Sequence, residues 1–469
     1  MSHIEFAHTI PTSLNDAWRL HARDGIVARL TPGFSRMKVR QQTDDLRDGT
    51  TIFNLPGGLE WVGQHVPEKF KDHELFTDTC TTPGLGLVTG WTHQHGFSGD
   101  DDAATIHDSI HLNAPEFAGR KLLEPVFAYR QNQLLQDVLF LQRAREWEDG
   151  NAATGAAVTS AATSTQTTAP RTIAVTGADG LVGTQLCALL SLAGHTIKKL
   201  SRSTNWNPDN PEDDLLEGVD TLIHLAGHPI AGRFTDEHVK KVEESRVGPT
   251  RRLAELAAAT DSITTFVCAS AVGFFGHAQS TPVDESGDAG EGILAGVVKR
   301  WEEATQPAKD AGVRVVNVRS GLVIAGGSPM LDLLSASVKT GGGHLGDGTQ
   351  HFAWIAIDDV VDIYYRAAID PEMEGVVNAV APETVTNHEF AKKLADVGGG
   401  AALIPVPKAA PAVMLGKDGA RELALADQNV QPGVLTQMGH TFRYPTVETA
   451  LRHELIKEAQ HTSDSSLKA

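Results

Sequence analysis

Three glycines at a spacing of three follow a short β-branched run near the middle of the chain. The segment 171–176 leads into Gly177, Gly180 and Gly183. Gly177 allows a sharp turn, Gly180 lets bare backbone approach a diphosphate, and Gly183 lets a helix pack closely on a strand. Free N–H groups at the start of that helix attract an anion. The pattern predicts a strand, a phosphate-binding turn and a helix start that together bind a dinucleotide.

The expected contacts with the dinucleotide cover the whole turn. They are Gly177, Ala178, Asp179, Gly180, Leu181, Val182 and Gly183. After the next predicted strand, 196–200, the chain carries Ser201 and Arg202, with no carboxylate before Asp209. An acidic residue here would bind the adenosine ribose, whereas a guanidinium suits a 2′-phosphate. NADP(H) is therefore favoured over NAD(H), the alternative being that Arg202 is a solvated surface residue.

Further elements continue the alternation of strand and helix. A buried strand over 219–225 is expected to end at Leu225, Ala226 and Gly227, whose small residues let backbone approach the cofactor. Helices are expected over about 235–259, with Arg246 in the middle. The next strand, 263–269, leads into Ser270. Alternating strands and helices predict a doubly wound parallel sheet of the Rossmann type.

Composition bounds the class of protein. The chain has 469 residues, enough for two or three domains, and 41% hydrophobic residues provide material for their cores. A net charge of −19 argues against nucleic acid as a partner. Three widely spaced cysteines suit a reducing compartment without a disulfide framework. The start resembles no secretory signal and no apolar run reaches membrane length, so we expect a cytoplasmic protein without a membrane partner.

A low-complexity segment separates two unlike halves. Of the twenty residues 151–170, fifteen are Ala, Thr or Ser, and none is charged or aromatic. Such a composition cannot bury enough apolar surface to fold, which predicts a flexible linker. The expected domains are 1–148, a linker over 149–170, and 171–469, with a small helical cap on the last domain at about 371–460.

The first half alternates short strands and ends in a helix. Strands are expected over 4–8, 58–66, 73–79, 90–97 and 105–112, and a helix over 127–144. An antiparallel sheet closed over one long helix leaves a cavity suited to an apolar ligand. This half resembles the START-like (helix-grip, SRPBCC) ligand-binding superfamily, which implies an α+β fold.

Two histidine pairs in this half have spacings that suit metal binding. His93 and His95, and likewise His107 and His111, would share one face of a strand. Because the sequence clusters no cysteine or carboxylate with them, we interpret them as ordinary strand histidines. No metal site is therefore predicted.

The second half carries motifs along nearly its whole length. It resembles the extended short-chain dehydrogenase/reductases, and among them the atypical members of the NAD-dependent epimerase/dehydratase family that are often labelled nucleoside-diphosphate-sugar epimerases. The matching segments are 176–183, 224–227, 244–246, 269–276, 319–323, 354–360 and 439–445. The resemblance implies a small-molecule substrate and places Arg246, Ser270, Arg319, Ser320 and Gly321 among the cofactor-binding residues.

The catalytic pair of that family is missing here. Related enzymes carry Tyr-x-x-x-Lys on the helix after the serine strand, since a phenol needs an adjacent cation to move a proton near neutral pH. Aligning the helix on Glu302 puts Leu294 and Val298 at those two positions. Ser270 matches the family's catalytic serine, but no base is evident beside it, and it is equally interpretable as a polar residue at a strand end.

The sequence is compatible with two functions. In the first, the protein is an NADP(H)-dependent enzyme acting on a small hydroxyl or carbonyl compound, with the missing phenol replaced by water, by His228 or Asp284, or by a group from the first half. In the second, it binds the dinucleotide without catalysis and acts as a redox-sensing module coupled to the START-like half. Of the two, we expect the enzyme.

Overall fold

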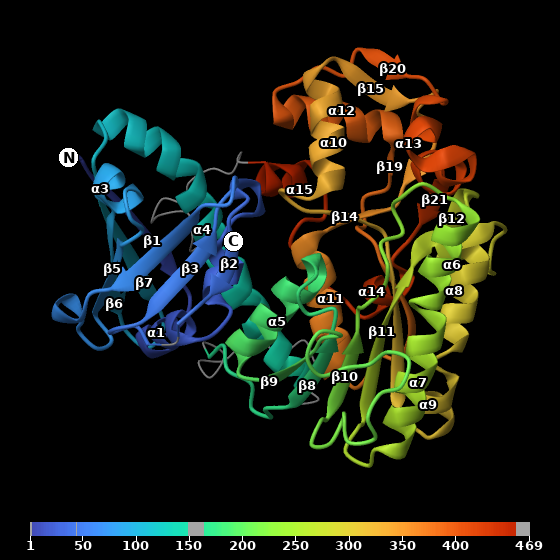
Figure 1. Ribbon diagram of the computed structural model, residues 1–469, viewed down its shortest axis with the longest axis horizontal. Coiled ribbons are helices and arrows are strands. Elements are labelled where there is room, and N and C mark those ends of the chain that lie inside the picture. Colours follow the sequence, from blue (N-terminus) through green and yellow to red (C-terminus); the bar gives the residue numbers. More distant parts are fainter. Residues whose placement is uncertain (1, 44, 149–163, 456–469) are drawn as a thin grey trace. The chain divides into compact units, whose positions relative to one another are not determined.

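The computed structural model describes residues 2–43, 45–148 and 164–455, and these form two units with separate sheets (Figure 1). The first unit runs to Pro170, and the second contains Arg171–Cys187 and Thr196–Leu455, with Ala188–His195 grouped with the first. Most of the predicted linker lies outside the described residues, as does the chain after 455. Within the described ranges, no helix is long and apolar enough to cross a membrane.

The first unit is built on a seven-stranded antiparallel sheet. Its strand order is β1-β7-β6-β5-β4-β3-β2. Buried and exposed residues alternate along β1, as expected for a sheet with one face covered. The strands are β1 (Ser2–Ile10), β2 (Lys38–Gln41), β3 (Thr50–Asn54), β4 (Glu60–His65), β5 (Leu75–Cys80), β6 (Thr92–Gly99) and β7 (Ala104–Leu112).

One long helix accompanies this sheet. The helix α4 (Glu116–Glu148) is longer than the predicted 127–144 and contains Pro125, which has no N–H to donate to the preceding turn. Phe127 stacks on Phe6 of β1 with ring centroids 4.4 Å apart. The described residues of the unit also form three short α-helices, α1 (Leu14–Ala22), α2 (Ile26–Leu30) and α3 (Leu85–Thr89), besides two 3₁₀ turns.

The second unit is built on a six-stranded sheet whose pairings are all parallel. Its order is β18-β13-β11-β10-β8-β9. The chain passes from β8 to β9 on one side and then to β10 on the other, so the order reverses at β8, where ligands bind in such folds. The strands are β8 (Thr172–Thr176), β9 (Thr196–Leu200), β10 (Thr221–His224), β11 (Thr265–Ala271), β13 (Arg314–Ser320) and β18 (Gly375–Ala379).

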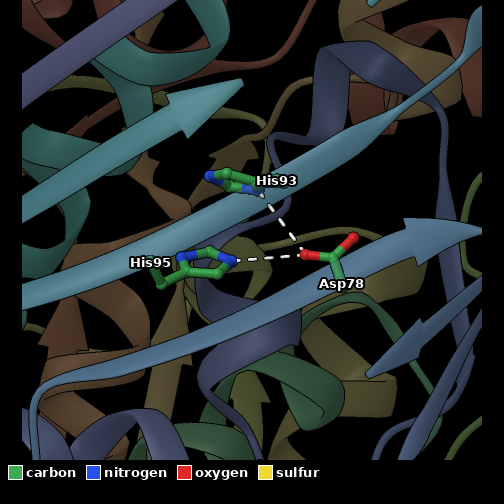
Figure 2. Close-up of side chains that lie close together, drawn as sticks. All are labelled: Asp78, His93 and His95. Atoms are coloured by element: carbon green, nitrogen blue, oxygen red, sulfur yellow. Dashed lines mark ion pairs between the residues drawn. The ribbon is translucent and has the colours of Figure 1, made fainter. Parts of the chain in front are cut away.

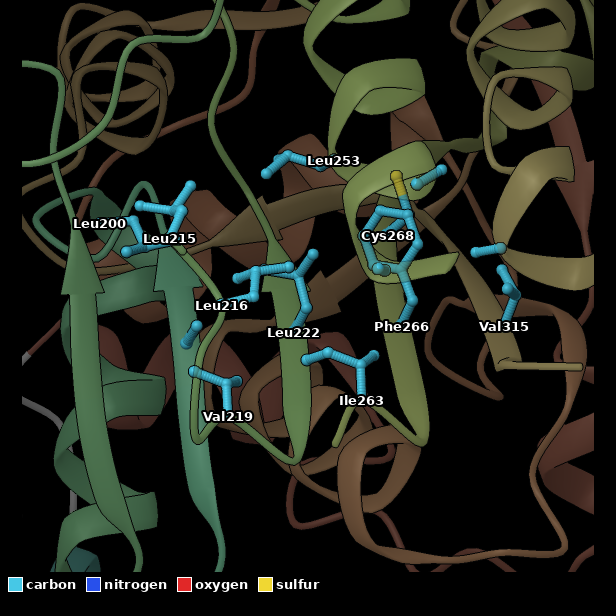
Figure 3. Packing of buried hydrophobic residues seen from close by; sticks show 14 of the residues in the cluster. Leu200, Leu215, Leu216, Val219, Leu222, Leu253, Ile263, Phe266, Cys268 and Val315 are labelled. Atoms are coloured by element: carbon cyan, nitrogen blue, oxygen red, sulfur yellow. The ribbon is translucent and has the colours of Figure 1, made fainter. Parts of the chain in front are cut away.

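Helices cover this parallel sheet. Leu222, Phe266 and Val315, on three neighbouring strands, belong to one buried cluster that includes Leu253 and Trp301 from two of the helices (Figure 3). The predicted helical region 235–259 is two helices that meet at Arg246. The helices are α5 (Leu181–Ala193), α6 (Asp236–Glu244), α7 (Val247–Ala259), α8 (Ile293–Glu303), α9 (Gln306–Asp310) and α11 (Ile357–Ile369).

The predicted helical cap differs from the observed structure. Residues 375–379 form β18 in the main sheet, and several short strands occur where only helices were expected. The outer elements have their own buried cluster, which includes Leu331, Phe390 and Leu451. They are β12 (Ala278–Val283), β14 (Leu322–Ile324), α10 (Pro329–Lys339), β15 (Gly342–Leu345), β16 (His351–Phe352), β17 (Trp354–Ala356), β19 (Val385–Thr386), α12 (Asn387–Gly398), β20 (Ile404–Val406), α13 (Ala410–Gly419), β21 (Asp427–Val430), α14 (Gly433–Gln437) and α15 (Val447–Glu454).

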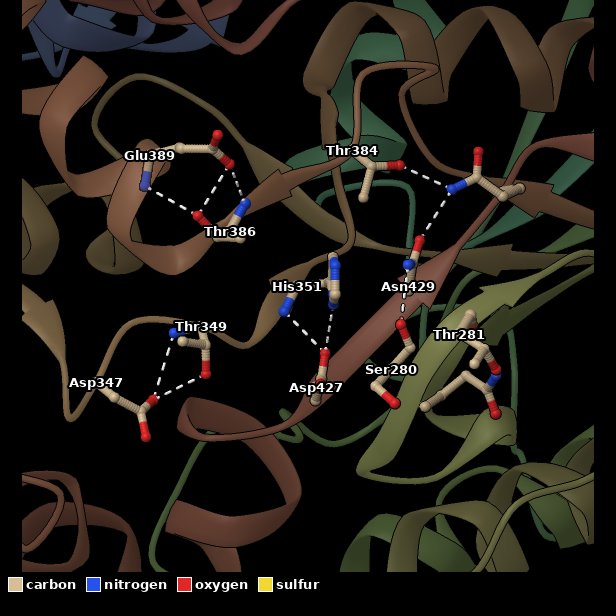
Figure 4. A network of polar contacts seen from close by, with 12 residues as sticks. Ser280, Thr281, Asp347, Thr349, His351, Thr384, Thr386, Glu389, Asp427 and Asn429 are labelled. Atoms are coloured by element: carbon tan, nitrogen blue, oxygen red, sulfur yellow. Dashed lines mark hydrogen bonds and ion pairs between the residues drawn. The ribbon is translucent and has the colours of Figure 1, made fainter.

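Polar side chains join the short strands of this outer region. His351 of β16 donates its backbone N–H to Asp427 of β21 at 2.8 Å, and Asn429 of β21 donates to the carbonyl of Ser280 in β12 at 3.0 Å (Figure 4). Thr386 begins α12 as the N-cap of a capping box with Glu389. These contacts hold strands that are too short to be stable as isolated pairs.

Replacing Gly183 tests the packing of α5 on β8. A Cβ at this position would collide with the carbonyl oxygen of Gly177 and lie 2.9 Å from Ala178 Cα. We expect Gly183→Ala to lower the free energy of unfolding of the second unit by about 1–3 kcal/mol, the usual range for overpacking. Gly180→Ala is the control, because its Cβ would meet only Gly177 O, at 3.1 Å. Equal urea transitions for the two variants would contradict this account.

Candidate functional site

The glycine turn between β8 and α5 forms a cradle of exposed backbone. Gly177 has φ +69°, and a Cβ there would lie 2.9 Å from the backbone nitrogen of Ala226. At Gly180 the space is open except for Gly177 O, whereas at Gly183 it is filled by the turn itself. Asp179, Gly180 and Leu181 are exposed at the start of α5, while Ala178 is buried and Val182 half-buried. A side chain thus has no room at Gly177 or Gly183, whereas the backbone at Gly180 stays accessible.

The end of β10 lies directly against this turn. The backbone N–H groups of Leu225 and Ala226 each donate to Thr176 Oγ1 at 3.2 Å. Thr176 Oγ1 also lies 2.6 Å from His224 Nδ1. Burial, with a smaller effect of the Arg246 charge, lowers the pKa of His224 to about 3, so this imidazole is neutral at physiological pH. Thr176 thus ties together the carboxyl ends of β8 and β10.

Arg246 places a buried positive charge beside Gly227. A Cβ on Gly227 would lie 2.8 Å from the guanidinium carbon. The guanidinium donates to the carbonyls of His228 and Val242, while its Nε has no hydrogen-bond partner among the described residues. Burial lowers the pKa of Arg246 to about 10. A buried cation without a carboxylate in hydrogen-bond contact is suited to an anionic ligand.

Ser201 and Arg202 lie in the turn that follows β9. Ser201 Oγ is 2.8 Å from Ser203 Oγ, and the Ser201 N–H donates to Asn205 at 2.9 Å. Arg202 is exposed, and no ion pair of the described residues uses its guanidinium. The turn therefore leaves the Arg202 side chain available to a ligand at the edge of the sheet.

The sequence showed no partner for Ser270, but in the structure its side chain lies at the end of a buried hydrogen-bond network. Its hydroxyl donates to Glu302 Oε1 at 2.5 Å. Arg319 holds both oxygens of Glu302 at 2.7 Å and stacks on Phe274, with its guanidinium carbon 3.4 Å from the ring centroid. Because Ser270 donates its proton to Glu302, its oxygen is left as an acceptor.

The remaining predicted cofactor contacts, Arg319, Ser320 and Gly321, already have partners within the protein. The Arg319 side chain is committed to Glu302, and the Ser320 hydroxyl is hydrogen-bonded to Tyr364. A Cβ on Gly321 would lie 2.7 Å from the carbonyl oxygen of Ala353, so this glycine serves close backbone packing. The side chains of Arg319 and Ser320 therefore contact protein groups in this structure.

The face of α8 next to the serine strand is apolar in the two turns before Glu302. Leu294 and Val298 are buried, and a Cβ on Gly273 would lie 3.5 Å from Leu294 Cβ and 3.9 Å from Val298 Cγ2. They therefore lie beside the turn that follows Ser270, at the positions expected for the missing catalytic pair. No phenol or ammonium replaces them on this face.

The first unit contains a cluster that the sequence interpretation missed. Asp78 Oδ2 lies 3.7 Å from His93 Nδ1 and 3.4 Å from His95 Nε2 (Figure 2). The other nitrogens of both rings face Asp108 Oδ1, at 2.9 Å for His93 and 3.1 Å for His95. The expectation that no carboxylate lies beside His93 and His95 was wrong. Asp78 is the cross-strand neighbour of His93, and Asp108 is that of His95.

The other histidine pair behaves as expected for surface residues. His107 and His111 are both exposed on β7. His107 Nε2 lies 3.0 Å from Ser98 Oγ, and His111 stacks on His3 with ring centroids 4.5 Å apart. Neither belongs to a group of side chains that could hold a metal among the described residues.

Burial and charge set the protonation of the cluster. Burial lowers the pKa of His93, with a further contribution from the neighbouring His95. Burial also disfavours charge on His95, but its contacts with Asp108 and Asp78 outweigh this and raise its pKa. Burial opposes ionisation of Asp108, yet both imidazoles hold its pKa well below the usual range. The cluster is thus a tightly coupled set of buried charges.

Three residues of the cluster line a large cavity in the first unit. Its volume is about 760 Å³, within the range of small-molecule sites, and most of its wall is apolar. Phe34, Phe53, Leu55 and Trp61 contribute to that wall. Asp78, His93 and His95 are among the lining residues, whereas Asp108 is not.

Changing Glu302 tests the hydrogen-bond network at Ser270. Glu302→Gln would leave the Arg319 guanidinium, whose side chain is 4% exposed, without its counter-charge. We expect the free energy of unfolding to fall by about 3–5 kcal/mol, as for other buried pairs that lose one partner. The adjacent Glu303 is exposed, and Glu303→Gln is expected to change stability by no more than about 0.5 kcal/mol. Similar urea transitions for both variants would contradict the proposed importance of the pair.

Comparisons with known proteins cover both units. Residues 173–379 match the NAD dependent epimerase/dehydratase family, and residues 406–454 match a domain of unknown function, DUF1731. A crystal structure of a nucleoside-diphosphate sugar epimerase from Corynebacterium glutamicum is 40% identical and aligns with 97% of this chain and 90% of its own, with a TM-score of 0.83.

Two other relatives align with 60–61% of the chain. An epimerase family protein of Mycobacterium bovis is 34% identical over 293 residues, which cover 96% of its length. The human epimerase family protein SDR39U1 (isoform 2), solved with NADPH, is 28% identical over 61% of this chain and 99% of its own, with a TM-score of 0.55. With its parallel sheet and glycine turn, this chain belongs to the NAD-dependent epimerase/dehydratase family.

Proposed function

We propose that the second unit binds NADP(H) and oxidises or reduces a small hydroxyl or carbonyl compound related to nucleotide sugars. The observation that carries this proposal is the cradle at Gly177, Gly180 and Gly183, where open backbone meets the start of α5. The exposed Arg202 and the buried Arg246 add positive charge on either side of β8. The human relative solved with NADPH supports the choice of cofactor.

The residues of this chain divide the work of such a site. The glycine turn and Arg246 hold the diphosphate, and Arg202 contacts the 2′-phosphate. When bound, the nicotinamide supplies or accepts a hydride. As the substrate hydroxyl is oxidised, its proton passes to Ser270 Oγ while the serine proton passes to Glu302 Oε1, and reduction of a carbonyl returns both protons by the same path, with Arg319 holding Glu302 in place. Leu294 and Val298 exclude water from the position where relatives place their phenol.

The apolar face of α8 favours a second candidate function. With Leu294 and Val298 buried beside the serine strand, that face carries neither the phenol nor the ammonium with which related enzymes move the proton. In this alternative the cofactor is bound without turnover, and its occupancy regulates what the first unit binds.

For the first unit we propose a START-like ligand-binding role. Its seven antiparallel strands, the long helix α4 and the apolar cavity of about 760 Å³ support this assignment. The alignment with 97% of the chain in the C. glutamicum structure indicates that the two units also occur together elsewhere.

Charge reversal at Arg202 tests the cofactor preference. The loss of a charge-assisted bond worth about 1.5–3 kcal/mol corresponds to roughly 10- to 100-fold weaker binding. We expect Arg202→Asp to weaken NADPH binding by this factor in calorimetry while NADH binding stays equal or improves. The control is Arg251→Asp, an exposed arginine on α7. An unchanged preference would mean that another group holds the 2′-phosphate.

Turnover assays distinguish the enzyme from the sensor. With NADPH bound, we expect the absorbance of the reduced nicotinamide to fall when nucleotide keto-sugars or small carbonyl compounds are added. Ser270→Ala should slow this reaction by about 100-fold or more, the usual effect of losing a polar contact to the reacting oxygen. Tight NADPH binding without consumption across the panel would instead support the sensor.

A further inference from the structure

We propose that Asp78, His93 and His95 bind a divalent transition-metal ion at the wall of the cavity in the first unit. The three ligand atoms, Asp78 Oδ2, His93 Nδ1 and His95 Nε2, all lie within 4.8 Å of one another. They come from adjacent strands, β5 and β6, and Figure 2 shows both imidazoles beside the Asp78 carboxylate.

The separations between these atoms fit a metal of ordinary bond length. Ligands placed about 2.0–2.1 Å from a tetrahedral zinc ion lie about 3.4 Å apart. The distances from Asp78 Oδ2 are 3.4 Å to His95 Nε2 and 3.7 Å to His93 Nδ1. Both distances are longer than the usual hydrogen-bond length, so the three atoms leave room for an ion between them.

A second group orients two of the ligands. Asp108 Oδ1 is hydrogen-bonded to His93 Nε2 at 2.9 Å, and it lies 3.1 Å from His95 Nδ1 without a hydrogen bond between them. The indole N–H of Trp91 donates to Asp78 Oδ1 at 3.3 Å, which leaves Oδ2 to face the imidazoles. Carboxylates behind histidine ligands are the usual means of fixing the ring and its tautomer in metal sites.

Charge and donor type identify the class of ion. Asp78 and Asp108 bring two carboxylates into a region where both imidazoles are about nine-tenths buried, and a divalent cation balances those two charges. Two imidazole nitrogens with one carboxylate suit Zn²⁺ or Fe²⁺, whereas Mg²⁺ and Ca²⁺ prefer oxygen ligands alone.

The site is open on one side. The three ligand residues line the apolar cavity and Asp108 lies behind them, so the remaining coordination positions face the cavity. Three protein ligands with an open position are typical of catalytic rather than structural metal sites. The ligand suited to this cavity is an apolar molecule that carries one oxygen donor for the metal.

Titration of the full-length protein with Co²⁺ tests the site. After treatment with a chelator, we expect one Co²⁺ per chain to bind, with visible d–d absorption and quenching of tryptophan fluorescence through Trp91. Zn²⁺ should displace the ion, and Mg²⁺ and Ca²⁺ should not. Asp108→Asn is expected to weaken binding about 10- to 100-fold, as for other second-layer ligands, and Asp78→Asn by at least as much.

The control is His107→Gln, which changes an exposed histidine next to Asp108 in the sequence and should leave the titration unchanged. Circular dichroism of each variant shows whether it folds. If Asp78→Asn does not fold, anomalous scattering from crystals of the unmodified protein soaked in Co²⁺ locates the ion directly. Absence of Co²⁺ binding, equal binding by Asp78→Asn, or an anomalous peak away from the three ligand atoms would overturn the proposal.

Discussion

The close contact between the glycine turn and α5 is the constraint on which the second unit depends. A side chain at Gly183 has no room, because the carbonyl of Gly177 and the Cα of Ala178 already occupy that space. This contact fixes α5 against β8, so that the first turn of the helix faces the point where the strand order reverses. Thr176, bound to the amides of Leu225 and Ala226, then brings the end of β10 to the same place.

In the first unit, the register of the antiparallel sheet brings the residues of the candidate site together. Three antiparallel strands place Asp78 opposite His93 and Asp108 opposite His95. Residues directly opposite one another in such a sheet point to the same face, so two pairings gather four titratable side chains. A shift of one residue in either pairing would turn part of this cluster to the other face of the sheet.

Much of the fold was predictable because periodicity and glycine spacing are local signals. The structure has strands within all five segments predicted in the first half, and the parallel sheet follows from the alternation of strands and helices. The strands β2 and β3 were missed, since β2 is mostly exposed and lacks alternating apolar residues. The beginning of α4 was missed because Pro125 normally ends a helix.

The candidate sites were predictable only where they are continuous in sequence. The turn at 177–183 is one segment, whereas Glu302 lies 32 residues from Ser270 and Asp108 lies 15 from His93. The pairing of 95 with 108 was within reach, because both strands around it were predicted, they follow one another in the chain, and a short hairpin would limit their register. Whether those side chains face a cavity depends on the closure of α4 over the sheet, which no local pattern records.

The proline within α4 affects how firmly one part of the cavity wall in the first unit is held. Because Pro125 cannot donate to the carbonyl four residues earlier, the turns from Glu116 to Glu124 are held to the rest of the helix by fewer bonds. Lys121, Leu122 and Leu123 of those turns line the cavity, and Leu122 is 70% exposed. Fraying of this short stretch costs less than unwinding the body of the helix, so this part of the cavity wall is held less firmly than the part formed by Phe127 and the residues beyond it.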